Sequence, residues 1–78
     1  MTIDELLQPI LNTARPLNIT DSPQSVPTWD SLAHINIISA IEDLTGTELS
    51  TEEVMNLTSV EAVVGICLAR GFALESEH

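Results

Sequence analysis

Three side chains near the middle of the sequence have functional groups that could act together in catalysis: Asp30, Ser31 and His34. A serine becomes a nucleophile when a histidine takes its proton and an acid orients that histidine. In a helix, His34 can approach Ser31 across one turn, but Asp30 and Ser31 point in different directions. The flanking sequence also has no glycine-rich elbow or oxyanion loop. The spacing therefore argues against a hydrolase, and we assign no catalytic residue.

The same residues suit the start of a helix over residues 31–45. Pro27 keeps the chain extended before it, and Asp30 or Ser31 can cap its free N–H groups. Gly46 is placed to end it. Apolar residues cover a broad arc of this helix, so we expect other helices to bury it on several sides. These residues are Leu32, Ile35, Ile37, Ile38, Ile41 and Leu44.

The composition predicts one small acidic domain spanning residues 1–78. Twelve acids face two arginines and no lysine, which gives a net charge of −10. This charge argues against nucleic-acid binding and favours partners with basic patches, with solubility alone as the alternative. The single cysteine, Cys67, cannot form an internal disulfide or a zinc site. With no long apolar run and no basic signal sequence, we expect a cytoplasmic monomer without a membrane span or a bound metal.

Three further helices are expected, over residues 2–14, 51–56 and 59–70. Each start has capping-box spacing, in the pairs Thr2–Glu5, Ser50–Glu53 and Thr58–Glu61. Pro9 is expected to kink or split the first helix. Gly65 is expected to allow a close helix contact in the last one.

The segments between and after these helices are expected to be irregular. Three prolines make residues 15–30 a long loop, which Leu17, Ile19 and Val26 should pin to the core. The tail, residues 72–78, is expected to fray except where Phe72 or Leu74 docks. The predicted fold is all-α: a small four-helix bundle with a long first loop and a short third helix.

In this setting the chain resembles the acyl carrier protein family, whose signature is Asp-Ser-Leu at the start of the second of four helices. The matching residues are Asp30-Ser31-Leu32. Further resemblance lies in A-I-E-D at 40–43, E-L-S-T-E-E at 48–53 and L-T-S-V at 57–60. The resemblance covers about residues 2–70.

The resemblance implies a carrier, which is not an enzyme itself. A phosphopantetheinyl transferase would attach a 4'-phosphopantetheine arm from coenzyme A to Ser31, and the arm's thiol would hold a biosynthetic intermediate as a thioester. Enzymes that load or use this cargo would dock through basic patches, although a plain solvated face remains the alternative for the acids. The implied recognition residues are Asp30, Leu32, Asn36, Ser39, Glu42, Asp43 and Val54.

Several residues depart from the pattern of carriers in fatty acid synthesis. Asn36 and Ser39 replace an acid and a large apolar residue, Thr45 replaces an aromatic, and Trp29 replaces a glycine or alanine. These departures suggest a carrier in a dedicated, secondary-metabolite-type pathway. The cargo stays open among fatty acyl, polyketide, hydroxyacyl and aminoacyl groups. An aminoacyl or peptidyl carrier and an unmodified acidic adaptor for a basic partner are the alternatives.

Two aromatic residues beside the motif have simpler expected roles. Trp29 is expected to pack against the loop rather than contact a partner. His34 is expected to be an exposed residue of the first helical turn rather than a catalyst.

Overall fold

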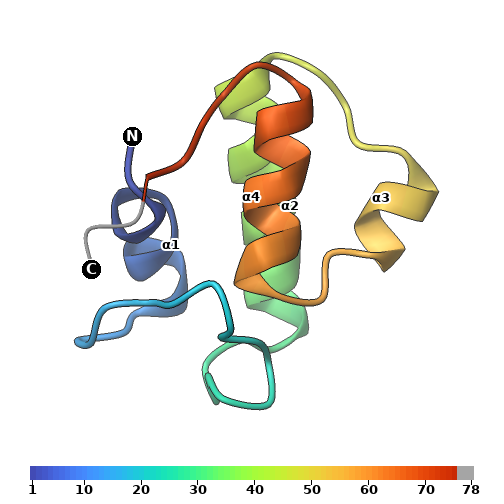
Figure 1. Ribbon diagram of the computed structural model, residues 1–78. Helices are drawn as coiled ribbons and strands as arrows, with labels where there is room; N and C mark the ends of the chain where they lie inside the picture. Colours follow the sequence, from blue (N-terminus) through green and yellow to red (C-terminus); the bar gives the residue numbers. More distant parts are fainter. Residues whose placement is uncertain (76–78) are drawn as a thin grey trace.

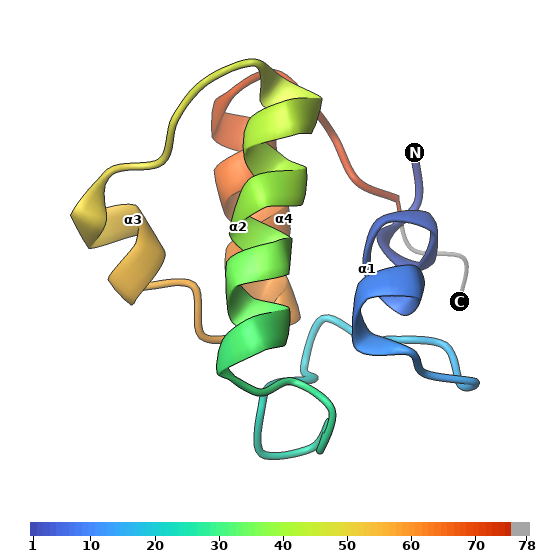
Figure 2. The same cartoon turned by 180° about the vertical axis from the view of Figure 1, so that it is seen from behind.

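A computed structural model describes residues 1–75 of the chain as a small bundle of helices. The helices are α1 (Ile3–Leu11), α2 (Ser31–Thr45), α3 (Thr51–Met55) and α4 (Val60–Ala69). α2 and α4 lie side by side, with α1 on one side of them and α3 on the other (Figures 1 and 2). Residues 1–75 contain no strand beyond an isolated bridge between Thr2 and Glu75. The expected all-α four-helix fold is therefore confirmed.

α1 begins as its sequence predicts but ends earlier. The Thr2 hydroxyl accepts from the N–H of Glu5, and the Glu5 carboxylate accepts from the N–H of Thr2, each over 3.0 Å. The helix continues through Pro9 without being split. It ends at Leu11 because Asn12 adopts a left-handed backbone (φ 53°) and donates its N–H to the carbonyl of Gln8. The expected extension to residue 14 is wrong.

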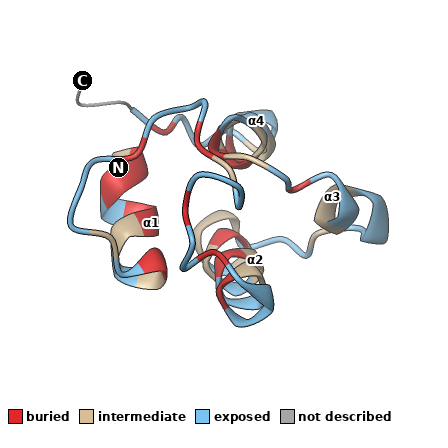
Figure 3. Cartoon of the chain, turned by 90° about the horizontal axis from the view of Figure 1, so that it is seen from below, coloured by how far each residue is buried: buried red, intermediate tan, exposed pale blue. Residues whose placement is uncertain are grey.

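The core lies where α1 and α4 pack on α2, together with buried loop residues (Figure 3). α2 contributes only a narrow strip to this core. The expectation that its whole apolar arc is buried is wrong, because Leu32 and Ile35 are 68% and 58% exposed. Neighbouring helices leave that side of α2 uncovered, and Leu68 on α4 is likewise exposed. The strip that α2 buries consists of Ala33, Ile37 and Ile41.

The long loop is organised around the buried carboxylate of Asp21. This carboxylate accepts two hydrogen bonds from Arg15 at 3.0 Å, one from the N–H of Asn18 and one from the hydroxyl of Ser25. The Arg15 hydrogen bonds in particular hold the pKa of Asp21 far below its usual range. These hydrogen bonds tie three parts of the loop to one carboxylate.

The loop is attached to the core at both ends and to the start of α4. Leu17 and Val26 are fully buried, as expected, but Ile19 is half exposed. Ile19 contributes its backbone carbonyl, which accepts from the N–H of Glu61 over 3.2 Å. The Ser59 hydroxyl caps α4 by accepting from the N–H of Ala62, so the capping box expected from Thr58 is not formed. The loop thus supplies part of the cap of α4.

α3 contains five residues and buries none of them. The expected capping box is present, with Ser50 and Glu53 bonded to each other's backbone N–H groups. Arg70 donates to both carboxylate oxygens of Glu53. The Arg70 side chain and the Ser50 N–H lower the pKa of Glu53 to about 2. Polar contacts with the end of α4 therefore help to hold α3 in place.

Residues 72–75 contact both the core and the start of the chain. Leu74 is buried, which confirms its expected docking, whereas Phe72 is 39% exposed. The carbonyl of Glu75 accepts from the N–H of Ile3, and the N–H of Glu75 donates to the carbonyl of Met1. These backbone bonds and the Leu74 side chain oppose fraying. The rest of the predicted frayed tail, residues 76–78, lies outside the described residues.

Among the described helices, none combines the length and the apolar character that crossing a membrane requires.

Candidate functional site

The start of α2 leaves the serine hydroxyl exposed and assigns the capping role to its neighbour. Asp30 is the N-cap, and its Oδ1 accepts from the N–H of Ala33 over 2.9 Å. Ser31 is the first helical residue and is exposed. Among the described residues, no side-chain hydrogen bond involves its hydroxyl. The cap interpretation therefore applies to Asp30, and Ser31 is available for another role.

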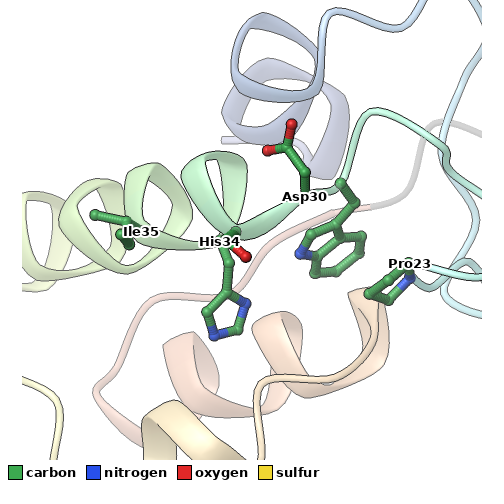
Figure 4. Close-up of a pocket in the computed structure, with 6 residues that line it drawn as sticks. Pro23, Asp30, His34 and Ile35 are labelled. Carbon is green, nitrogen blue, oxygen red and sulfur yellow. The ribbon is translucent and has the colours of Figure 1, made fainter.

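An open pocket of about 480 Å³ lies beside Ser31. Its lining joins the first turn of α2 to the long loop, and Figure 4 shows His34 and Ile35 on the helix with Pro23 on the loop. The lining residues are Pro23, Trp29, Asp30, Ser31, His34 and Ile35. Sequence analysis identified the serine but not this pocket, because Pro23 reaches it only through the folding of the loop.

Trp29 is buried, with 5% of its surface exposed, so the expectation that it packs is confirmed. Its backbone N–H donates to the carbonyl of Val26 over 2.9 Å. Its indole Nε1 is buried and has no hydrogen-bond partner, the one such side-chain atom within residues 1–75. A buried tryptophan usually finds a partner for its N–H, so this donor is unusual.

His34 is half-buried against the pocket rather than exposed as expected. The Asp30 carboxylate points away from the imidazole ring (Figure 4) and instead bonds to the N–H of Ala33. An acid oriented in this way cannot hold a histidine as a base for Ser31. The geometry agrees with the sequence in arguing against a hydrolase at this position.

Four of the seven predicted recognition residues lie together on one exposed face of α2. Leu32, Asn36, Ser39 and Asp43 are exposed at spacings of four, three and four residues, which places them along one face of α2. Exposed Ile35 adjoins them, one turn from Leu32. We call these five residues the α2 stripe. Sequence analysis omitted Ile35 from the recognition set because its apolar side chain suggested the core.

The remaining three predicted recognition residues lie off this stripe. Asp30 is exposed at the end of the helix, where its carboxylate is bonded as the cap. Glu42 is half-buried, and its Oε2 accepts from the N–H of Leu49 over 2.9 Å. Val54 is half-buried on α3. Glu42 therefore has a structural role in fixing the segment between α2 and α3.

Cys67 and the titratable clusters offer no second centre of chemistry in the described part of the chain. Cys67 is fully buried in α4, and its burial raises the pKa of the thiol. A buried thiol with a raised pKa is a poor nucleophile and metal ligand. Residues 1–75 also contain no group of three metal-ligating side chains.

No family model and no curated protein matches the chain. Among solved structures, it is similar to one described as "a putative acyl carrier protein" from Mycobacterium tuberculosis. The TM-score is 0.71 and the sequence identity is 26%, and the match covers 90% of this chain and 93% of that one. Taken with the four-helix fold and the Asp-Ser-Leu start of α2, this likeness shows that the chain has an acyl carrier protein-like fold.

Proposed function

We propose that this protein is an acyl carrier whose Ser31 hydroxyl is the attachment point of a 4'-phosphopantetheine arm. The observation that supports this most is the exposed and unbonded hydroxyl of Ser31 directly after the Asp30 cap. Serine is one of the residues preferred as the cap at this end of a helix. Here the cap is made by Asp30, so modification of Ser31 leaves it intact.

The first turn of α2 suits the charge that the arm would bring. Free backbone N–H groups and the dipole of the 15-residue helix favour an anion at this end. A phosphodiester on Ser31 would place its negative charge in that field. The attached arm supplies a terminal thiol, which holds cargo as a thioester, while the protein supplies attachment, presentation and recognition.

The charge and the exposed stripe favour enzymes with basic patches as partners. The chain carries a net charge of −10, and both of its arginines lie in ion pairs with its own acids. Exposed Leu32 and Ile35 add an apolar contact area beside Ser31. We infer that a phosphopantetheinyl transferase and acyl-loading enzymes contact the α2 stripe together with Asp30, Glu42 and Val54.

We further propose a cytoplasmic role in a dedicated, secondary-metabolite-type pathway. Asn36 and Ser39 are exposed, so a docking enzyme would contact an amide and a small hydroxyl there. These groups differ from the acid and large apolar residue that resemblance to fatty acid carriers would lead one to expect. A partner fitted to those carriers would lose one ionic and one apolar contact on this surface.

Intact mass spectrometry tests the modification directly. The protein is incubated with coenzyme A and a phosphopantetheinyl transferase of broad specificity, beside the variants Ser31→Ala and Thr51→Ala. Thr51 is the matched control, because it is also an exposed hydroxyl at the first position of a helix behind a capping residue. We expect a mass gain of one phosphopantetheine for the wild type and Thr51→Ala, and none for Ser31→Ala.

Absence of that gain on folded protein, with several transferases, would contradict the carrier function. The unmodified acidic adaptor would then be the better assignment. If the arm is attached, incubation of the modified protein with acyl-activating and aminoacyl-activating enzymes separates an acyl carrier from an aminoacyl or peptidyl carrier by the mass of the thioester formed.

A further inference from the structure

The buried indole N–H of Trp29 has no acceptor within residues 1–75, yet the residue forms part of the pocket wall beside Ser31. Burying a donor without an acceptor is unfavourable, because the group loses its hydrogen bonds to water and gains none in return. Trp29 lines the pocket but Nε1 itself is covered, so a ligand in the pocket brings an acceptor to this donor only where the side chains over Nε1 shift.

The pocket indicates where that acceptor would lie relative to Ser31. Ser31 and Trp29 both line it, so a group bonded to the Ser31 oxygen begins within the same space as the indole. Pro23, Ile35 and the indole ring provide apolar walls. A ligand that fits this lining has a hydrogen-bond acceptor near Ser31 and apolar atoms directly after it.

A phosphopantetheine arm has this order of groups, with phosphate oxygens beside the serine and a dimethyl-substituted carbon following them. We propose that the pocket holds the first part of the arm and that the Trp29 Nε1–H donates to a phosphate oxygen. This assignment rests on the proposed function of Ser31. Trp29 is then a positioning residue, which limits the directions in which the arm leaves α2.

Trp29 is the only tryptophan in the chain, so its indole N–H gives a single, assignable signal in a ¹H–¹⁵N spectrum. We would record that signal before and after attachment of the arm, confirming attachment by intact mass. The expected result is a downfield shift of the indole proton and slower exchange with water in the arm-bearing protein. A signal that stays in place and exchanges at the same rate would overturn the proposal.

The variant Trp29→Phe keeps an aromatic ring and removes the donor. In the arm-bearing form, we expect the ³¹P signal of the phosphodiester to differ between this variant and the wild type. The control Leu68→Val changes an exposed apolar side chain outside the pocket lining, and its ³¹P signal should coincide with that of the wild type. If Trp29→Phe does not fold, the indole shift of the wild type decides the question alone.

The outcomes separate this proposal from the proposed function. If intact mass shows the arm but neither the indole nor the ³¹P signal responds, the role of Trp29 is wrong and the carrier function stands. If the indole signal moves only after cargo is loaded on the thiol, the pocket binds cargo and the assignment to the phosphate is overturned. If no arm is attached to the folded protein, both proposals fail.

Discussion

The guanidinium of Arg70, directly after α4, donates to both carboxylate oxygens of Glu53 in α3. The same guanidinium donates to the hydroxyl of Thr47 over 2.7 Å, in the segment that leads into α3. Because α3 has no buried residue, these polar contacts replace the apolar packing that fixes the other helices. The position of α3 should therefore depend on Arg70 more than the rest of the fold does.

Replacing Arg70 by Gln should loosen α3 while the core persists. We expect the backbone amides of α3 to exchange faster with solvent in Arg70→Gln, because the bidentate ion pair is lost. Amides of α1 should keep their protection, since α1 packs on α2 and makes none of these contacts. Hydrogen exchange followed by mass spectrometry resolves the two segments. Equal acceleration in α1 and α3 would mean that Arg70 stabilises the whole fold instead.

Acid should destabilise the protein through Glu53 and Asp21. Both carboxyl groups have a pKa in the folded protein below the values of 4.5 and 3.8 usual for free Glu and Asp side chains, with Glu53 at about 2. A lowered pKa contributes stability that is present above the unfolded pKa and is lost as pH falls through the folded one. The melting temperature should therefore fall as pH is lowered from about 5 towards 2.

The variant Glu53→Gln isolates one of these two contributions. It removes a carboxyl with a lowered pKa, so its melting temperature should depend less on pH over the same range. Glu61→Gln is the control, because Glu61 is an exposed acid that takes part in neither the Arg15–Asp21 nor the Arg70–Glu53 ion pair. Parallel curves for Glu53→Gln and the wild type would show that the Arg70 pair contributes little to acid sensitivity.

Replacing Gly65 by Ala should stabilise the protein. A Cβ built at Gly65 meets no atom within 4 Å, so the expected close helix contact is absent. Alanine in a helix interior is favoured over glycine by about 0.8–1 kcal/mol. Urea unfolding of Gly65→Ala should show an increase of this order. Gly46→Ala should instead lower the free energy of unfolding, because φ at Gly46 is 69° and an L-residue is strained there.

Replacing Leu32 by Ala should impair modification more than stability. Leu32 is 68% exposed, so its truncation removes little buried surface and should leave the melting temperature nearly unchanged. Ile37→Ala removes a fully buried side chain and should cost about 2–5 kcal/mol. The rate of phosphopantetheine attachment to Leu32→Ala should fall, because the α2 stripe loses an apolar contact next to Ser31. An unchanged rate would exclude Leu32 from the contact with the transferase.

The sequence predicted two of the three expected capping boxes because capping is local, whereas the box at Thr58–Glu61 is replaced by a Ser59 cap. The boxes at Thr2–Glu5 and Ser50–Glu53 need only residues three apart, and both are present. The start of α2 at Ser31 follows from Asp30 in the same way. The early end of α1 was missed because the apolar pattern continues beyond Asn12. An asparagine can adopt either a helical or a left-handed backbone, and the sequence does not say that Asn12 takes the left-handed one.

The exposure of apolar side chains could not be predicted from periodicity. Leu32 and Ile37 are equally apolar and lie on the same helix, yet one is exposed and the other fully buried. The difference depends on which faces of α2 are covered by α1 and α4. The pocket was missed for a related reason, since it depends on the hydrogen bonds that fold residues 15–30 around Asp21.

The contact between Ile3 and Glu75 joins segments separated by almost the whole sequence. During synthesis, α1 is made well before residue 75 and can complete this contact only after residue 75 has emerged. The α2–α4 pairing involves a shorter separation and can form earlier. We therefore expect the docking of residues 72–75 beside α1 to be among the last contacts of the fold to form.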